Sequence, residues 1–82
     1  MNREEILAQL ETVLKTILQL PKDEKVDADI PLSDYGLDSM LKVDLALEVQ
    51  QKFGYKIPAT EIDVQLESLS VLADHIEENQ KA

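Results

Sequence analysis

Residues 3–18, REEILAQLETVLKTIL, carry the clearest helical pattern of this 82-residue chain. Their apolar side chains recur at steps of three and four residues, which places them on one face of a helix: Ile6, Leu7, Leu10, Val13, Leu14, Ile17 and Leu18. Asn2 is a good N-cap, and Glu5 follows three residues later as in a capping box. Because Pro21 cannot continue a helix, we expect this helix to end near Leu20.

A second helical pattern covers residues 39–53. One half of its helical wheel holds an apolar arc that we expect to be buried: Val43, Leu45, Ala46, Val49 and Phe53. Leu41 and Leu47 mark the two edges of this arc, which is wider than a single buried stripe needs. Gly54 stands where a left-handed C-cap belongs, so the helix should end at Phe53.

The connection over residues 22–38 has no sustained periodicity and contains Pro31 and Gly36. Loops of this length are uncommon in small domains and usually serve a function or are disordered. Four spaced apolar residues could anchor this one to the core: Val26, Ile30, Leu32 and Leu37. We therefore expect an ordered, functional loop.

Two shorter patterns complete the chain. Residues 59–66 are compatible with a short helix, and residues 70–79 predict a closing helix capped by Ser68 or Ser70. With few aromatic residues and few glycines, the composition argues against a sandwich or barrel. The expected fold is all-α: a single domain over residues 1–82, folded as a four-helix bundle of three main helices and a short third helix, with a long loop between helices one and two.

The net charge of −9 limits the classes of partner. Such a surface repels nucleic-acid phosphates and anionic membranes, so an electrostatic partner should be basic. The N-terminal residues have no long apolar run, and we expect neither a signal peptide nor membrane insertion. The expectation is a cytoplasmic monomer.

Metal and thiol chemistry have little support in the composition. The chain has no cysteine, and His75 has no second histidine or thiolate to complete a metal site or a catalytic triad. Asp27 and Asp29 resemble the start of a calcium loop, but Leu32 stands where that loop requires glycine. We expect no dedicated metal site.

Ser39 stands where the long loop meets the start of the second helix, shortly after Gly36, which permits a tight turn. Backbone N–H groups and the positive end of the helix dipole would stabilise a phosphate esterified to its hydroxyl. The alternative is that Ser39 or Asp38 only caps the helix, since both residue types are preferred there.

Residues 36–40, Gly-Leu-Asp-Ser-Met, closely resemble the Gly-x-Asp-Ser-Leu motif of acyl and peptidyl carrier proteins. The spacing to Phe53 and to Ile57-Pro58 matches as well, and the resemblance extends over essentially the whole chain. It implies that Ser39 carries the 4′-phosphopantetheine of coenzyme A, on whose thiol an acyl or aminoacyl chain is held as a thioester. Asp38 would contribute to recognition by the phosphopantetheinyl transferase, or would only cap the helix.

The second helix departs from the fatty-acid carriers, in which this helix is typically rich in carboxylates. Here its two acidic residues are balanced by two lysines. The resemblance therefore points to polyketide or nonribosomal-peptide assembly, with Leu41, Asp44 and Leu47 facing the partner; the two leucines could equally be flanking core residues. The motif is also similar to that of carriers of D-alanine, which leaves an aminoacyl cargo open.

The partners that the resemblance implies are a phosphopantetheinyl transferase, an acyltransferase or adenylating loading enzyme, and a ketosynthase or condensation enzyme. The protein itself would be a carrier and no enzyme, because no general base is identifiable near Ser39. The alternative from another class is an acidic helical module that binds a basic partner and is never modified.

Overall fold

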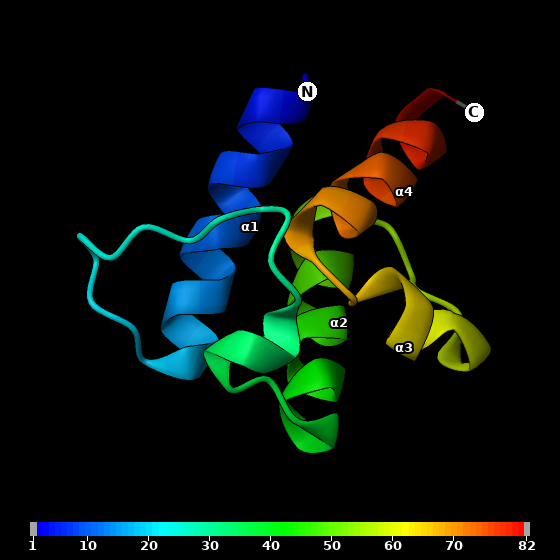
Figure 1. The fold of residues 1–82 in the computed structure, drawn as a ribbon. Coiled ribbons are helices and arrows are strands. Elements are labelled where there is room, and N and C mark those ends of the chain that lie inside the picture. Colours follow the sequence, from blue (N-terminus) through cyan, green and yellow to red (C-terminus); the bar gives the residue numbers. More distant parts are fainter. Residues whose placement is uncertain (1, 82) are drawn as a thin grey trace.

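A computed structural model describes residues 2–81, and in this range the chain is helical and has no strand (Figure 1). The α-helices are α1 (Arg3–Leu18), α2 (Ser39–Phe53), α3 (Ile62–Gln65) and α4 (Leu69–Lys81), and two 3₁₀ turns, η1 (Leu32–Tyr35) and η2 (Ala59–Glu61), precede α2 and α3. The all-α class and the four helices expected from the sequence are confirmed. The short helix expected over residues 59–66 is divided between η2 and α3.

The helices pack around α1, which contacts both α4 and α2, while the short α3 contacts α2 and α4. Figure 1 shows that α1 begins and α4 finishes at the same end of the bundle. At the opposite end, α1 finishes and α2 begins, so α2 runs antiparallel to α1. The reversal is made by the long connection and not by a tight hairpin.

Both ends of α1 are set by local geometry. The Oδ1 atom of Asn2 accepts a hydrogen bond from the Glu5 N–H at 2.9 Å, and the Glu5 carboxylate accepts one from the Asn2 N–H at 3.3 Å, which confirms the capping box. The helix ends at Leu18 because Gln19 adopts the left-handed conformation, with φ of 57°. This end lies slightly before the expected one at Leu20.

The core consists of apolar side chains from all four helices and from the long connection: Ile6, Leu10, Val13, Leu14, Leu32, Leu37, Leu45, Val49, Ile57, Leu66, Leu69, Leu72, Ala73 and Ile76. Among the expected loop anchors, Leu32 and Leu37 are buried and Val26 is half-buried. The prediction for Ile30 is wrong, because this side chain is 36% exposed at a bend of the connection.

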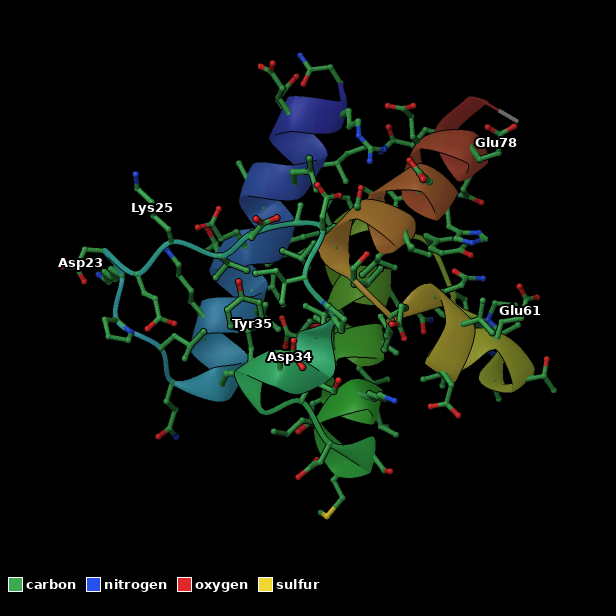
Figure 2. The ribbon with its side chains drawn as sticks, viewed as in Figure 1. Asp23, Lys25, Asp34, Tyr35, Glu61 and Glu78 are labelled. Carbon is green, nitrogen blue, oxygen red and sulfur yellow. The ribbon has the colours of Figure 1, made fainter. Side chains whose placement is uncertain are left out.

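Backbone hydrogen bonds hold the long connection against the α3–α4 junction. The Leu32 N–H donates to the Glu67 carbonyl at 2.8 Å, and the Ser70 N–H donates to the Ala28 carbonyl at 2.9 Å. The ring of Tyr35 reaches back so that its hydroxyl accepts the Asp27 N–H at 2.9 Å (Figure 2). These bonds give the connection a defined path to the start of α2.

The buried side of α2 is narrower than the sequence pattern predicted. Leu45 and Val49 are fully buried, but Val43 is 50% exposed, so its assignment to the buried half of the helix is wrong. Val43 lies two residues, or about 200° around the helix, from Leu45. Three neighbours cover α2: the core, α1 and α3. Val43 lies on the remaining, outward side of the helix.

The hydrogen bonds at the start of α4 show which of the two serines caps this helix. The Ser68 Oγ accepts the Val71 N–H at 3.3 Å, whereas the Ser70 Oγ accepts a hydrogen bond from the Arg3 guanidinium at 2.8 Å. Arg3 also forms an ion pair with Asp74. Ser68 is therefore the cap, and Ser70 helps to hold the start of α1 against α4.

Candidate functional site

The site begins at the turn that ends η1. Gly36 has a φ of 97°, and an added Cβ would meet nothing within 4 Å, so the glycine is required by the backbone angle and not by lack of space. Its N–H donates to the Ser33 carbonyl at 3.1 Å. Leu37 then inserts into the core and the chain enters α2 directly afterwards. The glycine and the buried leucine together fix the direction in which α2 starts.

Asp38 is the N-cap of α2, with its Oδ1 accepting the Leu41 N–H at 2.9 Å. Of the two capping residues considered from the sequence, the structure gives this role to Asp38. Ser39 is the first residue of α2 and does not cap it. The Ser39 hydroxyl is thereby free of a structural duty at the helix start.

Ser39 is exposed, and within residues 2–81 its hydroxyl makes no hydrogen bond. The first N–H groups of any helix lack partners within it, and in the described chain the N–H groups of Ser39 and Met40 have no acceptor. Unpaired N–H groups at the positive end of a helix favour a bound phosphate. The residues present therefore fit a phosphoester on the Ser39 Oγ.

An apolar surface begins next to this serine. Met40, Val43 and Leu47 follow one another along the outward side of α2, with 80%, 50% and 53% of their areas exposed; we refer to these three residues as the outer stripe. Exposed apolar side chains that share one side of a helix are typical of contact surfaces on small proteins.

The partner-facing residues expected from the sequence are divided by the structure. Leu47 and Asp44 are exposed on α2, as a contact role requires. Leu41 is half-buried and packs against the hydrophobic core. Leu41 is therefore assigned to the edge of the core, because little of its side chain is left for a partner.

Polar contacts hold α3 beside α2. The Lys42 Nζ lies 2.9 Å from the Asp63 carboxylate. The Tyr55 hydroxyl donates to the buried Gln65 Oε1 at 2.6 Å, and the Gln65 amide donates to the Glu61 carboxylate at 3.1 Å. The burial of Gln65 was not predicted from the sequence. Its one signal there is its position among the apolar residues of this short helix. The Lys42 charge is thus turned toward α3 and away from the outer stripe.

Other parts of the described chain offer few alternatives for a site. Two surface hollows follow α1: one of about 500 Å³ lies against Lys15 and Lys22, and the other is bounded by Glu48 and Lys52 of α2; Ser39 lines neither. No group of three histidine or carboxylate side chains within residues 2–81 is arranged to hold a metal ion. None of the described helices combines the length and apolar composition needed to cross a bilayer.

A family model described as a phosphopantetheine attachment site matches residues 8–76. This chain belongs to the acyl and peptidyl carrier protein family. It is 34% identical over 80 residues to an acyl carrier protein of Coprothermobacter proteolyticus, and the match covers 96% of this chain and 95% of that protein. The protein is therefore a carrier whose cofactor is covalently attached 4′-phosphopantetheine.

Segments of two large synthases also match this carrier. It is 43% identical over 37 residues to the mellein synthase of Phaeosphaeria nodorum and 41% identical over 44 residues to the 6-methylsalicylic acid synthase of Aspergillus terreus. These matches cover 45% and 54% of this chain but only 2% of each synthase. The similarity to the synthases is thus confined to segments that span about half of this chain.

Proposed function

We propose that Ser39 carries the phosphopantetheine arm and that this carrier holds acyl intermediates in polyketide or related specialised-metabolite biosynthesis. The observation that carries the first part is the exposed Ser39 hydroxyl at the first position of α2, beside two backbone N–H groups without acceptors. Asp38 already caps the helix, so modification of Ser39 breaks no hydrogen bond in the described structure.

The residues around Ser39 have distinct duties in this proposal. The attached arm supplies a thiol on which an acyl group is held as a thioester. The start of α2 stabilises the phosphodiester charge through the dipole and the free N–H groups of Ser39 and Met40. The Asp38 carboxylate is exposed, with one oxygen engaged by the Leu41 N–H, and its other oxygen is open to the phosphopantetheinyl transferase.

Ser39→Ala tests the attachment site against Ser33→Ala, a second exposed serine shortly upstream in η1. Each apo-protein is incubated with coenzyme A, magnesium and a promiscuous phosphopantetheinyl transferase, and its intact mass is measured. We expect the original protein and Ser33→Ala to gain the mass of one arm and Ser39→Ala to gain none. Retained helical circular dichroism shows that each variant is folded; a labelled Ser39→Ala variant would contradict the assignment.

The proposed pathway is supported by the surface of α2. Its two acidic residues are balanced by two lysines, so this helix offers a basic partner little net charge to attract it. The outer stripe instead offers apolar area directly beside Ser39. In the acyl case, the loading enzyme is an acyltransferase and the condensing enzyme is a ketosynthase. Apolar docking fits enzymes of this kind that recognise the carrier by shape complementarity more than by charge.

The cargo distinguishes this proposal from an aminoacyl or D-alanyl carrier. We would recover the holo-protein from its native host under conditions that preserve thioesters and measure the mass of the released arm. An arm bearing a polyketide-type acyl group would support the proposal, and an arm bearing a simple fatty acyl group would contradict the pathway. An arm bearing an amino acid, loaded by an adenylating enzyme and used by a condensation enzyme, would contradict the pathway and leave the Ser39 assignment intact.

A further inference from the structure

We propose that Met40 is a reversible oxidation site that controls how partner enzymes reach the arm. Met40 directly follows Ser39, and 80% of its surface is exposed, the largest fraction among the exposed large apolar side chains of the described chain. The chain contains no cysteine, so its own oxidisable sulfur atoms are those of its two methionines. The proposal rests on the attachment of the arm at Ser39.

The chemistry requires a peroxide, which is the oxidant that we name. One oxygen atom of hydrogen peroxide is transferred to the Met40 Sδ, forming an S=O bond; the thioether loses two electrons, the O–O bond breaks, and the remaining atoms leave as water. The reverse step uses a methionine sulfoxide reductase with a thiol as the reductant. The exposure of Met40 gives both the oxidant and the reductase access to the sulfur.

The consequence follows from the place of Met40 in the outer stripe. Val43 and Leu47 lie three and seven residues further along the same side of α2, so a partner that covers this stripe must also cover the Met40 sulfur. A sulfoxide oxygen buried against an apolar surface without a donor opposes binding. The fold should be unaffected, because Met40 contributes nothing to the core.

The test uses the apo-protein, so that the thiol of the arm does not consume the oxidant. The original protein and Met40→Leu are treated with hydrogen peroxide, which is then removed with catalase, and peptide mapping locates the added oxygen. Leucine is the matched control because it is apolar, similar in volume and not oxidisable. The readout is the KM for the carrier and the kcat of a phosphopantetheinyl transferase with coenzyme A and magnesium, each protein being compared with itself before treatment.

We expect one added oxygen at Met40 and unchanged helical circular dichroism. The KM should rise about five- to thirtyfold, which is the change expected when one apolar anchor is lost. Peroxide should leave the KM of Met40→Leu unchanged, and sulfoxide reductase should restore that of the original protein. An equal rise in Met40→Leu, a Met40 that resists peroxide, or a fully oxidised protein with an unchanged KM would each overturn the proposal. A protein that accepts no arm before oxidation would overturn the Ser39 assignment as well.

Discussion

Helices α1 and α2 are similar in length, with 16 and 15 residues, and each has an asparagine or aspartate cap, yet they use their apolar residues differently. The buried residues of α1 fall on one face, and apart from Ala8 its exposed side chains are polar. In α2, Leu45 and Val49 are buried while the outer stripe is exposed on the other side. The large apolar side chains of α1 thus all lie in or against the core, whereas α2 also exposes large apolar side chains.

The difference shows that α2 carries apolar area that the core does not use. An exposed valine or leucine contributes little to folding, because its area is not removed from water. Such residues are favourable when another surface covers them. The position of the outer stripe beside Ser39 supports the proposal that the covering surface is an enzyme that acts on the arm.

The largest expected effect is a difference in the free energy of unfolding between variants of Leu45 and of Leu47, two leucines on α2. Leu45→Ala should lower the free energy of unfolding by about 2 to 5 kcal/mol, because it leaves a cavity in the core. Leu47→Ala should change it by less than about 0.5 kcal/mol, because its side chain is already exposed. Urea denaturation of both variants, with Leu10→Ala of α1 as a second buried control, measures the difference. Equal losses from Leu45 and Leu47 would show that α2 does not have two distinct faces.

A smaller effect is expected for partner docking. Leu47→Ala and Val43→Ala should each weaken acyl loading by a cognate loading enzyme by about 1 to 2 kcal/mol in kcat/KM, as expected for a truncated apolar anchor. Asp44→Asn should mainly slow association, and this effect should fade with added salt. Loading rates at two salt concentrations, measured on holo-proteins of confirmed helicity, make the comparison. Loss of loading in Asp44→Asn with both apolar variants unimpaired would mean that docking is electrostatic.

The smallest expected effect is the loss of stability when the N-cap of α1 or of α2 is removed. Asn2→Ala and Asp38→Ala should each lower the free energy of unfolding by about 0.5 to 2 kcal/mol. Only the second should slow attachment of the arm, because α1 begins at the end of the bundle opposite the start of α2. Asp38→Asn separates the two duties of Asp38, since asparagine keeps the cap but removes the charge. Thermal unfolding and labelling rates are the measurements; labelling of Asp38→Asn at the original rate would leave the aspartate with the capping role alone.

Local signals predicted much of this fold. The capping box at Asn2, the left-handed Gly54 at the end of α2 and the tight turn at Gly36 all depend on residues within a few positions of one another. The place of Ser39 at the start of α2 followed from the same kind of signal. That Ser39 bears the arm stays a prediction for the labelling experiment.

Contacts between distant residues decided what periodicity could not. The burial of Gln65 depends on Tyr55 and Glu61, which complete its hydrogen bonds, so its position among apolar residues was not enough to predict that it is buried. Ile30 had the apolar character of an anchor, but the bonds that tie Ala28 and Leu32 to the α3–α4 junction leave it at a bend.

Sequence patterns alone were enough to predict the all-α class, the bounds of α1 and α2 to within about two residues, and the serine at the start of the second helix. The pattern of α2 also indicated the buried arc correctly for Leu45, Ala46, Val49 and Phe53, but not for Val43. Apolar side chains extend beyond this arc, so the pattern alone did not show where the buried face ends. Only the tertiary structure decided that limit, because α1 and α3 cover Leu45 and Val49 and leave the outer stripe beside Ser39 open to a partner.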